Sequence, residues 1–274
     1  MVDPLAHVDP CAYYYDADYP SARDGGSNFD SVTGDQGIAY DIDRYEELAR
    51  TTAGPILEMG CGTGRVALPL ARAGHRVVGI DISRPMLEQF EQKLLAEPSE
   101  VQERLLLVTQ DIKDLDLEER TFGLVTLAFN SLFFVTSDSA QRQALASAKR
   151  HMRPSGLLAV DIVNDIYIKR EGIPEPKAFF TRVNPMTGNA YTRFDCIGPC
   201  DSEGRQRIYG HYLEVDIESG VQTLPYEMIW RPLDRNTVEN MLVGAGFTID
   251  VIEGGHRHEP YTATSQRMFI VARA

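Results

Sequence analysis

Basic residues are scarce in this chain. Its 27 lysines and arginines are outnumbered by 40 aspartates and glutamates, so the formal net charge at pH 7 is −13. Nucleic-acid binding requires basic stripes that displace counterions from phosphates, and the sequence contains no such stripe. An acidic surface is also repelled by anionic membranes. The composition therefore disfavours nucleic-acid and membrane partners, and a small molecule is the expected partner.

Long apolar runs and an export signal are also lacking. No stretch approaches the roughly 18 consecutive apolar residues of a membrane span, and no N-terminal segment joins basic residues to an apolar stretch. Four cysteines occur, Cys11, Cys61, Cys196 and Cys200, which favours a reducing compartment over a disulfide framework. The sequence therefore predicts a soluble, cytoplasmic protein.

Metal-ligand patterns are weak. Cys196 and Cys200 stand close together, but no histidine lies near them in the sequence. His256 and His258 are also close neighbours, yet no third ligand can be assigned to them. We therefore expect no metal site.

What is present is a strand, a glycine turn, a helix and a second strand between Ile56 and Asp81. The first apolar run ends in a glycine cluster at residues 60–64, and residues 66–73 repeat apolar side chains at helical spacing. Glycine permits positive φ and lets a ligand approach the backbone closely. A second apolar run ends at Asp81, whose carboxylate can accept the hydroxyl hydrogens of a ribose. This is the first half of a nucleotide-binding βαβ unit.

Glu58 indicates which adenosine-containing cofactor the unit binds. A dinucleotide would place its pyrophosphate at this turn, and a carboxylate two positions before Gly60 would repel it. The same carboxylate would attract a cation, such as the ammonium group of a methionine moiety. The spacing of Gly60, Gly62 and Gly64 also departs from the Gly-x-Gly-x-x-Gly of dinucleotide-binding turns.

With these features the chain resembles class I S-adenosylmethionine-dependent methyltransferases. Residues 58–64 look like the first motif of that family, and Asp81 looks like its ribose-binding acid. Residues 110–112 are similar to the segment that contacts the adenine, and the resemblance continues through residues 129–131 and 151–158. It implies S-adenosyl-L-methionine as the cofactor. The cofactor-binding residues expected are Tyr15, Tyr19, Glu58, Gly60, Cys61, Gly62, Gly64, Arg65, Asp81, Ile82, Met86, Asp111, Ile112, Phe129 and Asn130.

The resemblance also implies the fold, an α/β three-layer Rossmann-like domain with a seven-stranded sheet in the order 3-2-1-4-5-7-6. Between residues 165 and 233, four segments alternate apolar with polar residues and are separated by turn signals. They predict an inserted antiparallel β lid. The expected division is an N-terminal lid segment at 1–40, a cofactor-binding α/β domain at 41–164 and 234–274, and the inserted sheet at 165–233.

The N-terminal segment is rich in tyrosine. Residues 15–19 are similar to a pattern in small-molecule methyltransferases of this class, in which tyrosines close over the cofactor. A helix that packs its tyrosines on the domain surface is the alternative. Residues 21–37 are rich in Gly, Ser and Asp and are expected to form a loop over the mouth of the cofactor site.

The acceptor site is expected between the inserted sheet and the loop at residues 254–261. Candidate catalytic residues are His256, His258, Tyr15 and Glu227, because these side chains can take a proton from an acceptor. Aromatic rings on the inserted sheet suit an apolar or aromatic acceptor. The candidate substrate-binding residues are Tyr14, Tyr209, Tyr226, Trp230 and Arg257. The structural alternatives are solvated loop histidines and rings that only pack the small sheet.

Together these features predict methyl transfer to a small-molecule acceptor, a specialised metabolite with an aromatic, indole or amine group. Nitrogen, oxygen and carbon all stay open as the methylated atom. A nicotinamide-dependent oxidoreductase on a similar sheet and a non-catalytic cofactor-binding protein are the alternatives. The sequence leaves the oligomeric state open, with a homodimer as one option.

Overall fold

A seven-stranded sheet forms the centre of the molecule. The computed structural model describes residues 9–21, 23, 37–118 and 120–274. The strands of the sheet are β1 (Ile56–Met59), β2 (Val77–Asp81), β3 (Leu105–Thr109), β4 (Phe122–Leu127), β5 (Met152–Val163), β10 (Thr248–Glu253) and β11 (Arg267–Arg273). They lie in the order β10-β11-β5-β4-β1-β2-β3, and all neighbouring pairs are parallel except those that β11 makes with β5 and β10. Counted along the chain this is 3-2-1-4-5-7-6, so the predicted sheet order is confirmed.

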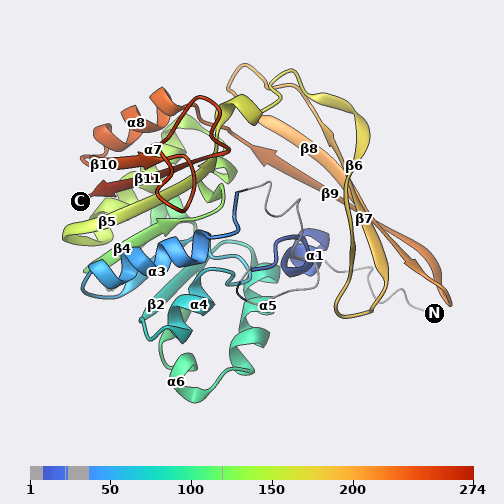
Figure 1. Ribbon diagram of the computed structural model, residues 1–274, viewed down its shortest axis with the longest axis horizontal. Coiled ribbons are helices and arrows are strands. Elements are labelled where there is room, and N and C mark those ends of the chain that lie inside the picture. Colours follow the sequence, from blue (N-terminus) through green and yellow to red (C-terminus); the bar gives the residue numbers. More distant parts are fainter. Residues whose placement is uncertain (1–8, 22, 24–36, 119) are drawn as a thin grey trace.

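Helices cover both faces of this sheet (Figure 1). They are α3 (Asp41–Thr51), α4 (Ala67–Arg72), α5 (Arg84–Leu95), α6 (Ser99–Gln102), α7 (Asp138–His151) and α8 (Arg235–Gly244). Successive strand residues point to opposite faces, so Leu124 packs with α3, α4 and α5, whereas Val125 packs with α7 and α8. Both faces of the central strands are therefore buried, as a parallel sheet requires. Ser83 and Asp234 each accept a backbone hydrogen bond at the start of their helix.

A second sheet lies between β5 and α8 in the chain and forms the curved wall on the right of Figure 1. Its strands are β6 (Ile173–Val183), β7 (Ala190–Ile197), β8 (Gln206–Asp216) and β9 (Gly220–Trp230), paired in that order and antiparallel throughout. The predicted inserted antiparallel sheet is thus confirmed. Short 3-10 turns at Ile112–Asp114, Ser131–Phe134 and Asp165–Tyr167 connect elements of the main domain.

Helix α1 (Pro10–Asp18) lies between the two sheets (Figure 1). On one side, Asp16 accepts hydrogen bonds from the Thr63 hydroxyl at 2.6 Å and from the Lys93 ammonium at 2.7 Å. On the other side, the Tyr14 hydroxyl donates to Glu214 of β8 at 2.6 Å. The helix therefore links the glycine turn of the main domain to the second sheet. Most of the loop expected at residues 21–37 lies outside the described residues.

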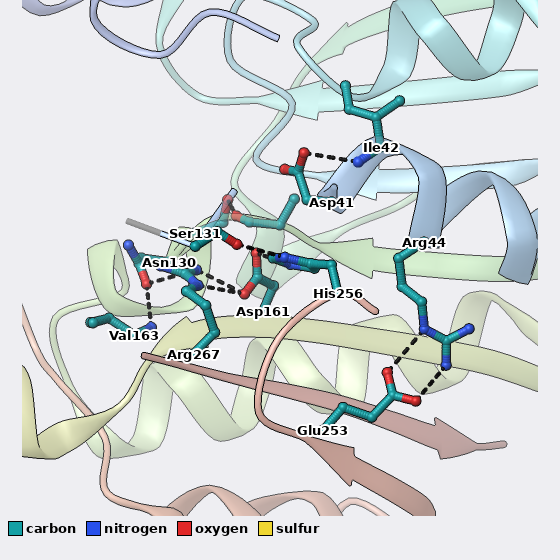
Figure 2. Close-up of polar contacts among 12 residues, drawn as sticks. Asp41, Ile42, Arg44, Asn130, Ser131, Asp161, Val163, Glu253, His256 and Arg267 are labelled. Carbon is teal, nitrogen blue, oxygen red and sulfur yellow. Dashed lines mark hydrogen bonds and ion pairs between the residues drawn. The ribbon is translucent and has the colours of Figure 1, made fainter. Parts of the chain in front are cut away.

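A buried ionic cluster joins the C-terminal ends of β5, β4 and the region before β11 (Figure 2). Asp161 is fully buried and pairs with the Arg267 guanidinium at 2.8 Å. Its other oxygen lies 3.2 Å from His256 Nε2, while His256 Nδ1 lies 2.7 Å from the carbonyl oxygen of Gly37. Burial alone would favour a neutral ring, but the Asp161 carboxylate outweighs it and the pKa of His256 is raised. Each ring nitrogen thus faces an acceptor, although the contact with Asp161 lacks hydrogen-bond geometry, and the protonated form of the ring is favoured.

Within the described residues, no helix is long and apolar enough to cross a membrane. The four cysteines are free thiols.

The close contact at Gly64 gives a stability prediction. A Cβ there would meet the Phe90 ring at 2.3 to 2.5 Å, at φ +85°, whereas a Cβ at Gly62 would meet no described heavy atom within 4 Å. We expect Gly64→Ala to lower the free energy of unfolding by about 2–4 kcal/mol, from overpacking added to left-handed strain. Gly62→Ala carries the strain alone, about 1 kcal/mol. Urea denaturation checks this, and equal losses in the two variants would contradict it.

The pairing of His256 gives a pH-dependent prediction. Because its pKa is raised in the folded protein, the stabilisation is complete below the unfolded value of about 6.5 and is lost as pH rises through the folded value. The stability advantage of the wild type over His256→Gln should therefore shrink above pH ~6.5, by at most about 1.4 kcal/mol per pH unit. Urea denaturation of both proteins at several pH values measures it. An advantage that is constant with pH would show that the folded ring is neutral.

Candidate active site

The glycine turn after β1 is held open by Asp81 at the end of β2. One carboxylate oxygen of Asp81 accepts the Gly62 N–H at 2.7 Å, and the other accepts the Ser83 N–H at 2.8 Å. Gly62 adopts φ 53° with open space around it. Burial raises the pKa of Asp81, although the backbone N–H groups counteract it. The backbone and an acid thus lie together at the carboxyl edge of the sheet, where ligands of open α/β sheets bind.

A cavity of about 610 Å³ opens over this turn, a size that suits a small-molecule cofactor. Nine residues of the predicted cofactor set line it. They are Tyr15, Gly60, Gly62, Asp81, Ile82, Met86, Asp111, Ile112 and Phe129. The sequence analysis missed Ser83, Lys113, Ser131, Phe134, Val135, Thr136, Ser137 and Ala140, which also line it. These come mostly from the segment between β4 and α7, where no glycine or acid pattern points to a ligand.

Four residues of the predicted cofactor set do not line either cavity. Cys61 packs into the core, and Gly64 lies against Phe90. Arg65 is buried in an ion pair with Asp41 at 2.6 Å. These three residues support the turn on the side that faces the core, and the ligand side of the turn is formed by Gly60 and Gly62. Tyr19 and Asn130 line the second cavity instead.

Glu58 is the fourth, and it lies buried behind the turn. It accepts the Ala67 N–H, and its Oε2 has no hydrogen-bond partner among the described residues. Burial raises the pKa of Glu58 to about 8, although Arg65 and the Ala67 N–H favour the ionised form. The Glu58 side chain is buried and does not line the cavity, so the structure shows no path for a direct contact with a ligand there. Any electrostatic effect of Glu58 acts through the turn.

A second cavity of about 540 Å³ adjoins the first and is bounded by α1, the main domain and the second sheet. Both cavities are lined by Tyr15, Ser83, Met86, Phe129 and Phe134. The wall between them is therefore shared. Two adjoining cavities with a common wall are what a transfer between two bound molecules requires.

Phe129 is the most constrained residue of this wall. It has φ 43°, and the next residue, Asn130, has φ 67°. The Asn130 side chain accepts the Val163 N–H at 2.7 Å, which holds this strained turn in place (Figure 2). The guanidinium carbons of Arg65 and Arg267 lie 5.1 and 5.3 Å from the Phe129 ring centre. Two buried cations and a strained backbone thus fix the ring between the cavities.

Three of the predicted acceptor-site residues line the second cavity, namely Tyr15, Glu227 and Trp230. The predicted base His256 lies in the buried cluster with Asp161, and it lines neither cavity. His258 is exposed at the surface and pairs with Glu47 and Glu253. Neither histidine lines a cavity, because the loop turns both side chains toward the acids of α3, β5 and β10.

Four predicted substrate-binding residues also lie elsewhere. Tyr14 is buried and stacks on Tyr212 at 4.2 Å. Tyr226 is buried, and its hydroxyl accepts from Arg193. Tyr209 lies on the outer face of the second sheet, and Arg257 packs over Tyr40 at the surface. Tyr14 of α1 packs against Tyr191, Tyr212 and Tyr226 on the inner face of the sheet, so part of that face is buried, whereas Phe179, Tyr212 and Trp230 line the cavity.

The polar wall of the second cavity was missed. It is formed by Asp18 of α1 with Arg193 and Asp195 of β7. Asp18 accepts hydrogen bonds from the Tyr191 and Tyr212 hydroxyls at 2.7 and 2.6 Å and from Arg193 at 3.2 Å. A signal was available, because residues 191, 193 and 195 alternate along one strand and share a face. Arg193 and Asp195 are charged although this face is turned inward, and charged residues on an inward face indicate a site.

No group of three or more His, Cys, Asp or Glu side chains able to hold a metal ion occurs in the described part of the chain.

Comparison with known proteins is consistent with this geometry. A family model described as a methyltransferase domain matches residues 56–156. The cypemycin N-terminal methyltransferase of a Streptomyces species is 29% identical over 223 residues, which cover 79% of this chain and 81% of that protein. The solved structure of the CcbJ methyltransferase of Streptomyces caelestis matches with a TM-score of 0.69 at 23% identity, covering 85% of this chain and 89% of that chain. The sugar N-methyltransferase KedS8 of a Streptoalloteichus species matches with a TM-score of 0.67 at 20% identity, covering 86% and 87%.

The two solved structures establish the fold, and the family model covers the strand, glycine turn and acid that line the first cavity. The relatives named above are methyltransferases, so the nicotinamide-dependent alternative is not supported. The chain therefore contains a methyltransferase domain, matched over residues 56–156, and has the fold of class I S-adenosylmethionine-dependent methyltransferases.

Proposed function

We propose that this enzyme methylates an amine nitrogen of a small-molecule acceptor bound in the second cavity. The observation that carries the proposal is the charge of that cavity. Its lining holds four carboxylates, from Asp9, Asp18, Asp195 and Glu227, and two guanidinium groups, from Arg193 and Arg267. A surplus of carboxylates attracts an ammonium group, and a carboxylate of the lining can accept the proton that the nitrogen must lose so that its lone pair can attack the methyl group. The relative named an N-terminal methyltransferase supports the same choice of atom.

We assign the first cavity to S-adenosylmethionine. The open space at Gly62 admits a ligand to the backbone, and Asp81 lies where a ribose can be bound. Ile82 is 67% exposed although it is apolar, so a flat adenine on it would cover surface that is otherwise wet. When bound, S-adenosylmethionine supplies a methyl group already activated by its sulfonium centre. The residues of the chain therefore have to bind the cofactor and the acceptor, orient them toward each other and exclude water.

Tyr15 and Tyr19 are assigned to orientation. The two rings lie 5.2 Å apart, and Tyr19 lies 4.9 Å from Phe129. Burial raises the pKa of Tyr15, so its phenol keeps its proton at neutral pH and is a poor base. We propose that it donates a hydrogen bond at the junction of the two cavities. The second sheet and α1 would then act as the roof that keeps water from the acceptor.

The acceptor atom is tested with labelled S-adenosylmethionine and paired acceptors. Arylalkyl amines, amino sugars and peptide N-termini are offered beside the corresponding alcohols and phenols. We expect methyl incorporation into the amines, with mass spectrometry placing the methyl on nitrogen. Incorporation confined to oxygen or carbon would contradict the proposal.

Asp81 gives a prediction for cofactor binding. Asp81→Ala removes an acceptor from the ribose and also releases the N–H of Gly62. We expect weaker binding of S-adenosylhomocysteine by about 1.5–3 kcal/mol, the range for hydrogen bonds to charged groups. Isothermal titration measures it. Asp116→Ala, which removes a carboxylate that is 89% exposed and outside the cavity, is the matched control. Equal effects of the two changes would remove Asp81 from the site.

Glu58 gives a prediction about protons. With a pKa of about 8, it is mostly protonated at pH 7, and a positively charged ligand nearby favours its ionised form. Binding of S-adenosylmethionine at pH 7 should therefore release a fraction of a proton, and its affinity should rise as pH approaches 8. Calorimetry in buffers of different ionisation enthalpy detects the release. Glu58→Gln should abolish it, and a wild type that releases no proton would show that the charge does not reach Glu58.

A further inference from the structure

We propose that Asp195 holds the amino group of the acceptor. The inference rests on the proposed amine acceptor and adds the residue that recognises it. Asp195 lies on β7, and its side chain lines the second cavity while keeping 14% of its surface exposed. It is therefore enclosed but reachable from the cavity.

The two oxygens of Asp195 have different surroundings. Oδ1 accepts hydrogen bonds from Arg193 Nε at 3.2 Å and from the Tyr226 hydroxyl. Oδ2 accepts none from the part of the chain that the structure describes, and it is not among the buried polar atoms that lack a partner. The carboxylate is thus fixed through Oδ1, and Oδ2 stays available to a ligand in the second cavity. A fixed carboxylate with one free oxygen is suited to accept an N–H of an amine or ammonium.

The other acids of the cavity are less suited to this task. Both oxygens of Asp18 are already used by Tyr191, Tyr212 and Arg193. Asp9 caps α1 and is exposed. Glu227 pairs with Arg207, and its side chain is 44% exposed, so water screens its charge. Asp195 therefore combines enclosure with an uncommitted oxygen.

Asp195 is also connected to the wall between the cavities. Arg193, which holds Oδ1, donates from Nη1 to the Tyr19 hydroxyl at 2.8 Å. Tyr19 in turn contacts Phe129, whose ring borders the first cavity. An amine on Asp195 therefore binds in a chain of contacts that leads to the cofactor. The remaining lining includes Phe134, Ile208 and Trp230, so the ligand class is a primary or secondary amine on an apolar or aromatic body.

The single tryptophan of the chain provides the readout. Trp230 lines the second cavity, so its fluorescence should report what enters. The protein saturated with S-adenosylhomocysteine is titrated with 2-phenylethylamine, 2-phenylethanol and 3-phenylpropionate, which share a ring and differ in charge. We expect the amine to bind at least ten-fold more tightly than the alcohol, with the acid weakest. An alcohol that binds as tightly as the amine would overturn the inference.

Asp195→Asn isolates the carboxylate. The variant should lose at least ten-fold in amine affinity while the alcohol affinity stays the same, which shows that the cavity is intact. Glu203→Gln removes an equal charge from the turn between β7 and β8, at a side chain 62% exposed and outside the cavity, and should change neither affinity. If Asp195→Asn does not fold, as judged by thermal melting, Asp195→Ser is measured in its place. An amine preference that survives removal of the carboxylate would overturn the inference.

The cofactor is measured separately, so three kinds of failure can be told apart. If S-adenosylhomocysteine does not bind by calorimetry, the assignment of the first cavity fails. If it binds normally but the amine is not preferred, the roles of Asp195 and of the amine acceptor fail while the cofactor assignment stands. If the wild type prefers the amine and Asp195→Asn keeps that preference, the amine acceptor stands and its anchor lies elsewhere.

Discussion

The second cavity depends on the buried carboxylate of Asp18. This side chain ends α1 and accepts three hydrogen bonds from β7 and β8, from Tyr191, Tyr212 and Arg193. A buried carboxylate is costly unless its oxygens are satisfied, and the second sheet supplies all three donors. The helix and the sheet therefore stabilise each other, and each forms part of the cavity wall. Because α1 is also held by Thr63 beside the glycine turn, the roof is attached to the cofactor side of the molecule.

A second constraint is the arrangement of charge around Phe129. Arg65 and Arg267 approach its ring and are each paired with a buried aspartate behind it, Asp41 and Asp161. Buried ion pairs of this kind add little net stability but fix geometry when their partners are well placed. Here they hold a strained backbone turn at the boundary of the two cavities. Asp195 and Glu227 of the second sheet line the same cavity as Phe129.

The two loop histidines illustrate the limit of local reasoning. A loop that reads Gly-Gly-His-Arg-His-Glu predicts either solvated residues or a base, since neither its neighbours nor its spacing indicates burial. In the structure His258 has φ 60° and remains at the surface, whereas His256 reaches Asp161 of β5. That contact joins residues 95 positions apart in the chain, and it follows from the antiparallel pairing of β11 with β5. Local sequence carries no signal for such a pairing.

The sequence by itself determined the second sheet and nine of the residues that line the first cavity, and its resemblance to class I methyltransferases implied the sheet order. The second sheet and the glycine turn follow from contiguous patterns, because the glycines, Asp81 and the strand periodicities each act over a few residues of chain. Only the tertiary structure decided the acceptor side. Asp18, Arg193 and Asp195 come from a helix and a strand more than 170 residues apart, and Glu58 and Arg65 were turned away from the ligand by packing. Contacts that close such long loops are chosen by the burial of whole elements, so the residues of the acceptor wall become apparent only when the elements are assembled.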